Sequence, residues 1–129
     1  MGEAFPVVYV ARHGETAWSL SGQRTGRTDL PLTPNGERNA NRLGARLKGL
    51  SFVKVFTSPC QRASRTCDLS GFGAQAEIDS DLVEWHCGEY EGRTSAEIHA
   101  KGPNWDLFRD GCPRRSMRGL TESWGVSGQ

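Results

Sequence analysis

Reactive and cationic side chains directly follow two apolar runs of the sequence. Arg12 and His13 come after residues 5–11, and Arg62 follows the run 52–57 after a short gap. Ligands of open α/β sheets bind beyond the carboxyl ends of the strands, so we expect these three side chains to share one crevice. An imidazole can serve as a nucleophile, and guanidinium groups bind phosphate oxygens through paired hydrogen bonds. The sequence therefore predicts a local anion site, with the amides of a helix N-terminus beside it.

Three segments have the composition of strands. Residues 5–11 form a continuous apolar, partly β-branched run, which is typical of a strand buried on both faces of a parallel sheet. Residues 52–57 predict a second strand, and residues 76–78 predict a short third one. The alternation of strands and helices indicates an α/β fold, with a parallel sheet, right-handed crossovers and flanking helices.

Helix signals lie between and after these strands. A Thr-Pro pair opens the segment 33–49 and predicts a helix that a glycine closes. A Ser-Pro pair opens the segment 58–69 in the same way, and a capping box at 94–97 predicts a third, shorter helix. Residues 14–32 have no sustained period and predict a long loop, which inside a compact domain is usually functional.

Length and charge limit the organisation of the protein. A chain of 129 residues has the length of one domain, and we expect a partial domain over residues 1–113 with an irregular tail over residues 114–129. A formal net charge of +1 gives no overall field toward nucleic acid or an anionic membrane. The short apolar N-terminal stretch fits neither a signal peptide nor a membrane span, so we expect a cytoplasmic protein.

Cysteine and histidine spacing gives no metal signal. No C-x-x-C pair occurs among the four cysteines, which are Cys60, Cys67, Cys87 and Cys112. We therefore expect neither a zinc site nor a disulfide framework. His86 and His99 lie near Cys87 and Glu84 in the sequence, but their spacing fits no zinc or facial-triad pattern.

Residues 12–16, Arg-His-Gly-Glu-Thr, resemble the R-H-G-E-[ST] signature of histidine phosphatases and cofactor-dependent phosphoglycerate mutases. Further segments match the family in order and spacing, namely 22–26, 29–36, 58–63 and 84–92. The resemblance covers roughly Val7 to Pro113. It implies a phosphoglycerate-mutase-like α/β fold that is incomplete at the C-terminus.

The resemblance also implies roles for individual residues. His13 would be the nucleophile that attacks phosphorus, and Arg12 and Arg62 would hold the equatorial phosphoryl oxygens. Glu84 would be the general acid that protonates the leaving oxygen and then activates water. The positions that match the family's substrate pocket are Ser19, Thr25 and Gly26.

The implied activity is metal-independent hydrolysis of a phosphomonoester through a phosphohistidine, without a cofactor. Residues 85–92 resemble the broad sugar-phosphatase branch, including sedoheptulose-bisphosphatase-like members, so a small phosphorylated metabolite is the expected partner. Ser19 and Cys87 depart from the asparagine and tyrosine that are common in mutases. Phosphoglycerate mutase and a non-catalytic, phosphate-binding remnant stay open as alternatives, and the sequence does not define the oligomeric state.

One part of the family pattern has no counterpart in this sequence. The family has a second histidine in a Ser-His-Gly type motif on a later strand, and residues 114–117, Arg-Arg-Ser-Met, depart from the family's continuation. We therefore expect a truncated gene product, and consider a reading frame shifted from about Arg114. An unpaired strand edge, exposed apolar faces and impaired activity would follow.

Overall fold

The computed structural model describes residues 2 and 4–113 of the 129-residue chain. Two short strands form a parallel sheet in that part: β1, Val55–Thr57, pairs along its whole length with β2, Ala76–Ile78. Parallel neighbours need a crossover connection, and the helix α3, Gln61–Leu69, supplies it. The predicted α/β class with a parallel sheet is confirmed.

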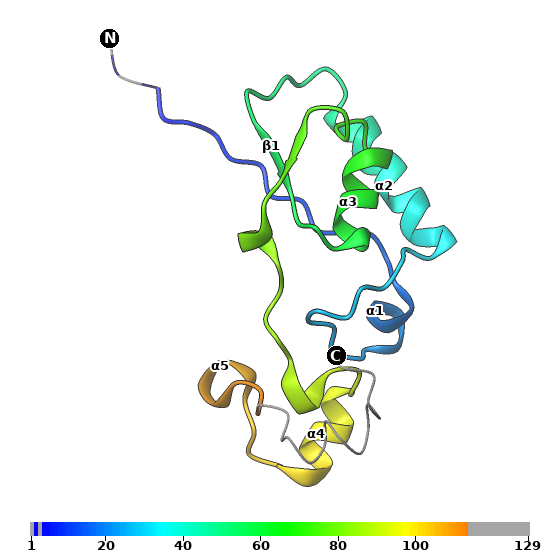
Figure 1. Cartoon of the computed structure of the whole chain (residues 1–129), viewed down its shortest axis with the longest axis vertical. Coiled ribbons are helices and arrows are strands. Elements are labelled where there is room, and N and C mark those ends of the chain that lie inside the picture. Colours follow the sequence, from blue (N-terminus) through cyan, green and yellow to red (C-terminus); the bar gives the residue numbers. More distant parts are fainter. Residues whose placement is uncertain (1, 3, 114–129) are drawn as a thin grey trace.

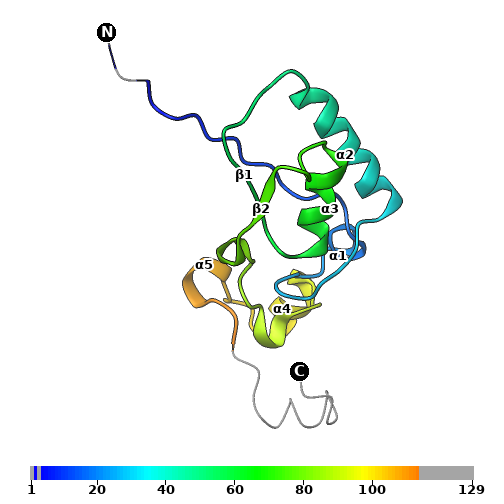
Figure 2. The same cartoon turned by 45° about the horizontal axis from the view of Figure 1, so that its top comes forward.

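The helix α2, Pro34–Leu47, begins where the sequence predicts. The Thr33 hydroxyl accepts a hydrogen bond from the Gly36 amide at 3.0 Å, and Pro34 occupies the first turn, where its missing N–H costs nothing. α2 packs against α3, and both helices lie on one side of the strands (Figures 1 and 2). α2 ends at Leu47, and Lys48 is its C-cap; Gly49 then has a φ of 88°, a conformation that favours glycine.

The predicted strand over residues 5–11 is wrong. Among the described residues, neither β1 nor β2 pairs with this segment, an extended chain whose N-terminal end runs away from the body of the protein (Figure 1), while Tyr9 packs edge-on against Phe52. Val10 is 93% exposed and Phe5 is 89% exposed. Apolar composition reports a preference for burial, but a strand also needs a bonded neighbour, and the described part supplies none here.

Three further features differ from the expectation. The predicted loop 14–32 contains the five-residue helix α1, Ala17–Ser21, which Thr16 and Ser19 cap reciprocally. A helix of five residues is too short to show a hydrophobic period, so the sequence pattern did not indicate α1. α3 begins at Gln61 rather than at Pro59, and the strand predicted over 52–57 is reduced to its last three residues.

The remaining described elements follow β2. A 3-10 turn at Ser80–Leu82 precedes another at Gly88–Tyr90. α4, Ser95–Lys101, has Thr94 as its N-cap, as predicted, and α5, Leu107–Asp110, was not predicted. The expected tail over residues 114–129 lies outside the described residues.

Helix length and composition also bear on membranes. In the part of the chain that the structure describes, no helix is long and apolar enough to cross a bilayer.

Candidate active site

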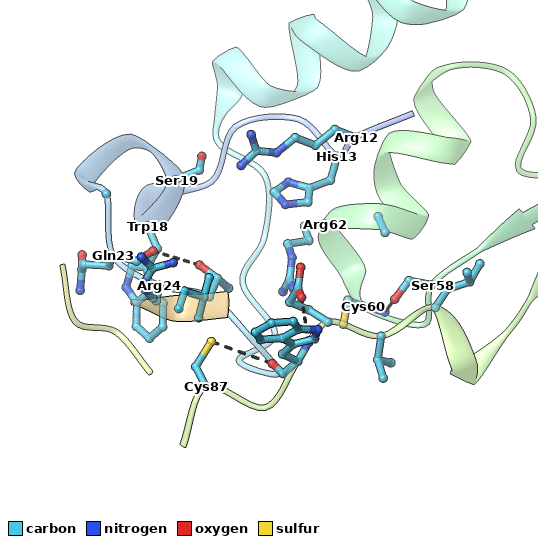
Figure 3. Close-up of a pocket in the computed structure, with 18 of the residues that line it drawn as sticks. Arg12, His13, Trp18, Ser19, Gln23, Arg24, Ser58, Cys60, Arg62 and Cys87 are labelled. Carbon is cyan, nitrogen blue, oxygen red and sulfur yellow. Dashed lines mark hydrogen bonds between the residues drawn. The ribbon is translucent and has the colours of Figure 1, made fainter. Parts of the chain in front are cut away.

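A cavity of about 870 Å³ lies beyond the carboxyl ends of β1 and β2 (Figure 3). The cavity is lined by Ser58, which comes after β1, and by residues 82–85, which come after β2. The residues directly after the segment 5–11 and the loop around α1 form further parts of the cavity wall. Six of the seven residues predicted for the site line it, namely Arg12, His13, Ser19, Thr25, Arg62 and Glu84.

The His13 ring has a defined tautomer. Its Nδ1 lies 2.7 Å from the carbonyl oxygen of Gly14, which can only accept a hydrogen bond. Nδ1 must therefore carry the proton, and Nε2 keeps its lone pair in the neutral ring. Burial is the main cause that lowers the pKa of His13, and the charges of Arg62 and Arg12 lower it further. The hydrogen bond to Gly14 and the charge of Glu84 raise it, but the net pKa is lowered. The neutral, nucleophilic form is thus favoured at pH 7.

This pKa shift predicts the pH dependence of the first chemical step. Protonation of Nε2 removes the attacking lone pair, so phosphorylation of His13 should slow only when the pH falls below the lowered pKa. We expect the acid limb to lie below the ordinary histidine value of about 6.5. Single-turnover rates against pH, measured with two esters of different phosphate pKa, separate the histidine from the substrate. An acid limb above the ordinary value that is the same for both esters would contradict the assignment.

The turn that presents His13 is held against both helices. The Gly14 amide donates to the Thr66 hydroxyl at 3.0 Å, and that hydroxyl donates to the Arg62 carbonyl at 2.7 Å. Gly14 also meets the start of α2 so closely that a Cβ on it would lie 2.3 Å from the Gly36 carbonyl oxygen. Gly14 and Gly36 therefore allow the backbone of the 13–15 turn to touch the start of α2. This contact fixes the turn that carries His13.

Gly36 provides a test of this close contact. A Cβ at Gly36 would lie 2.1 Å from the Glu15 carbonyl oxygen, so Gly36→Ala must push the 13–15 turn away from α2. We expect a loss of about 1–3 kcal/mol in the free energy of unfolding, measured by urea denaturation. Gly102→Ala is the matched control, because its Cβ would have no neighbour closer than 3.7 Å. Equal stability of the two variants would show that the contact is not required.

Arg62 is the most deeply buried charged group of the cavity wall, with 4% of its surface exposed. Its Nη1 donates to the Thr28 carbonyl and its Nη2 to the Gly26 carbonyl, both at 2.8 Å. These bonds fix the guanidinium plane close enough to His13 for its charge to affect the pKa of that ring. A fixed cation beside the nucleophile is suited to an anion that gains charge during reaction.

Glu91 holds the other side of the same loop. Its Oε1 accepts hydrogen bonds from the amides of Gly26, at 2.8 Å, and Thr28, at 3.1 Å. Burial raises the pKa of Glu91, but hydrogen bonds from Thr28, Gly26 and Cys87 outweigh it and the net pKa is lowered. The segment 26–28 therefore lies between a carboxylate and the Arg62 guanidinium. This role of Glu91 was not predicted from the sequence, although Glu91-Gly92 belongs to the matching segments.

Three of the predicted site residues need correction or detail. Gly26 does not line the cavity, because it is buried where a Cβ would lie 2.2 Å from the Trp85 carbonyl oxygen. The Ser19 hydroxyl donates to the Thr16 carbonyl and accepts from the Thr16 amide, so it is engaged in capping α1. Glu84 is exposed, and its Oε1 accepts from the Trp85 amide at 2.8 Å.

The other histidines are engaged elsewhere. His86 Nδ1 accepts from the Gly88 amide at 2.9 Å, and His99 Nε2 lies 3.0 Å from the Trp105 carbonyl oxygen. Within residues 2 and 4–113, no three His, Cys, Asp or Glu side chains gather as possible metal ligands. The four cysteines are free thiols, and burial is the main cause that raises the pKa of Cys87 to about 12.

Comparison with known proteins defines the family. The model of the histidine phosphatase superfamily (branch 1) matches residues 8–125, which is most of the chain. The chain belongs to this superfamily.

Individual relatives agree with this assignment. Sedoheptulose 1,7-bisphosphatase from Saccharomyces cerevisiae is 38% identical over 130 residues, covering 83% of this chain and 48% of that protein. The structure of the Rv3214 product from Mycobacterium tuberculosis superposes with a TM-score of 0.73 at 34% identity, covering 90% of this chain and 61% of that one. Phosphoglycerate mutase from Thermus thermophilus gives a TM-score of 0.57 at 42% identity, covering 64% and 46%. The phosphoglycerate-mutase-like fold is thereby confirmed, and the chain spans about half the length of the curated relatives it matches.

Proposed function

We propose that this protein hydrolyses phosphomonoesters of the sugar-phosphate type through a phosphohistidine at His13, without a metal ion or cofactor. The observation that carries the proposal is the position of the His13 ring between Arg12 and Arg62 in one cavity, with Nδ1 bonded to the Gly14 carbonyl so that Nε2 is left to attack (Figure 3). Membership of the histidine phosphatase superfamily and similarity to a bisphosphatase support it. The substrate is a small phosphorylated metabolite, and the proposed setting is the cytoplasm, with no nucleic acid or membrane partner.

The first step transfers the phosphoryl group to the protein. The lone pair of Nε2 attacks phosphorus, and the bond from phosphorus to the ester oxygen breaks. Arg12 and Arg62 bind the oxygens on which negative charge is spread in the transition state. Glu84, in its acid form, gives a proton to the leaving oxygen, and the free alcohol departs.

The second step returns the site to its starting state. Glu84, now a carboxylate, takes a proton from water as the water oxygen attacks phosphorus. The bond between phosphorus and Nε2 breaks, and inorganic phosphate leaves. The lowered pKa of His13 makes the neutral ring a suitable leaving group and a suitable nucleophile for the next cycle.

Release of inorganic phosphate tests the proposal. The chain is incubated with a panel of sugar phosphates, with a phosphodiester as a negative substrate, in the presence and absence of EDTA. We expect phosphate from monoesters alone and the same rate with EDTA. Isomerisation of phosphoglycerate after priming with bisphosphoglycerate would favour a mutase instead. A folded chain that does neither would favour a phosphate-binding remnant, and would overturn the proposed hydrolysis.

A further inference from the structure

A third arginine, Arg24, lies in the same cavity, away from the nucleophile. Arg24 lines the cavity on the side formed by the loop after α1, whereas Arg12, His13 and Arg62 gather at the other side (Figure 3). Among the described residues that line the cavity, Glu84 is the one carboxylate, and its Oε1 is already bonded to a backbone amide. The cavity wall therefore has three guanidinium groups against one carboxylate, and Arg24 is the guanidinium that lies apart from the nucleophile.

The backbone and side chain of Arg24 are both held in place. Its amide donates to the Arg93 carbonyl at 2.9 Å, and its carbonyl accepts from the Gly92 amide at 2.8 Å. Its guanidinium lies 5.1 Å from the ring centre of Trp105, and Nη2 donates to the Ser95 hydroxyl at 3.0 Å. A half-buried arginine fixed at four points is preorganised for binding, because little side-chain entropy remains to be lost.

The Arg24 charge has no counter-ion in the described part of the chain. No carboxylate of residues 2 and 4–113 forms an ion pair with it, and its Nε is a buried donor that has no hydrogen-bond partner there. A guanidinium has five N–H donors, of which a single one is bonded to a side chain. Partial burial of an unpaired cation is costly, and such groups in clefts are candidates for ligand binding.

We infer that Arg24 binds a second anionic group of the substrate while its phosphoryl group lies at His13. The substrate class is thus a phosphomonoester with a further carboxylate or phosphate at its other end, rather than a phosphorylated neutral alcohol. This inference rests on the proposed function for the position of the phosphoryl group. Arg24 is a specificity-determining residue and takes no part in bond breaking.

Matched pairs of substrates test the inference. In the first pair, glycerol 3-phosphate has a neutral remainder and 3-phosphoglycerate has a carboxylate in addition. In the second pair, fructose 6-phosphate has a neutral remainder and fructose 1,6-bisphosphate has a second phosphate. Arg24→Met keeps the apolar stem over Trp105 and removes the charge. We expect it to lower kcat/KM for at least one doubly anionic substrate by about 10- to 100-fold, and for the neutral-ended partner by less than about 2-fold. The pair that responds identifies which anion is bound.

Two further variants separate charge from structure. Arg24→Lys should restore part of the discrimination, because it retains the charge without the planar fork. Arg27→Met removes an equal charge from an exposed neighbour that does not line the cavity, and should leave both substrates unaffected. An equal loss on both members of each pair, or no loss on either, would overturn the role of Arg24.

Binding to His13→Ala distinguishes this inference from the proposed hydrolysis. Titration calorimetry with the same ligand pairs measures the preference for the second anion when the nucleophile is absent. A preference that Arg24→Met abolishes supports the inference even if the wild-type chain releases no phosphate, a result that would count against the proposed function alone. Turnover without any such preference, or no binding of either ligand, would overturn the inference.

Discussion

The His13→Ala variant is expected to lose phosphomonoester hydrolysis by at least about 10³-fold in kcat/KM. The methyl group cannot attack phosphorus, and the residual rate would come from Arg12 and Arg62 holding the ester before attack by water. The variant should keep its fold, because within residues 4–113 the His13 ring forms one hydrogen bond, to the carbonyl of the next residue. Initial rates of phosphate release at several substrate concentrations provide the measurement.

His99→Ala is the control for this result. His99 does not line the cavity, and its ring bonds to the Trp105 carbonyl in the α4 region. Its loss should leave the rate on a neutral-ended ester within about 3-fold, as is usual for a surface substitution. If His13→Ala hydrolyses esters as fast as the wild-type chain, the nucleophile lies elsewhere.

The Arg62→Ala variant should lose both activity and stability. Loss of one preorganised charge donor from a reaction site reduces the rate by about 10²- to 10³-fold. The carbonyls of Gly26 and Thr28 would also lose their charged partner in a buried position. We expect the free energy of unfolding to fall by about 3 kcal/mol, measured by urea denaturation beside the kinetic assay.

Arg65→Ala is a matched control on the same helix. Arg65 lies on the exposed side of α3, and its Nε is 3.4 Å from Glu37 Oε1 in a surface ion pair. Such pairs contribute less than about 1 kcal/mol, so this variant should remain close to the wild-type chain in both measurements. Arg62→Lys should lie between Arg62→Ala and wild type, since it keeps the charge but cannot bridge two carbonyls. A stable and active Arg62→Ala would contradict the role of the buried guanidinium.

Local signals predicted α2 and α4 from their N-caps, whereas the short helices α1 and α5 were missed. The Thr33 cap and Pro34 define the start of α2 through backbone geometry and one hydrogen bond, so no distant contact is needed. Thr94 defines α4 in the same way. The strand predicted over residues 5–11 was wrong because a strand depends on a neighbour that pairs with it. Composition does not show whether that neighbour is present.

The same distinction between local signals and distant contacts applies to the candidate site. His13, Arg12 and Arg62 could be predicted because each follows an apolar run in a motif of fixed spacing, and the cavity brings them together. The positions of Gly26 and Glu91 could not, because both depend on the loop 26–28 meeting residues more than sixty positions later in the chain. Arg24 was missed for a similar reason, since its partners Ser95 and Trp105 belong to the α4 region.

Direct detection of phosphorylated His13 tests the central claim. The chain is mixed rapidly with a phosphate ester, quenched in base to preserve phosphohistidine, and analysed by intact mass and peptide mapping beside His13→Ala. We expect one acid-labile phosphoryl group on the peptide that contains His13, and none in the variant. Phosphate release by a folded chain with no such adduct, or with the adduct on another residue, would contradict covalent catalysis at His13.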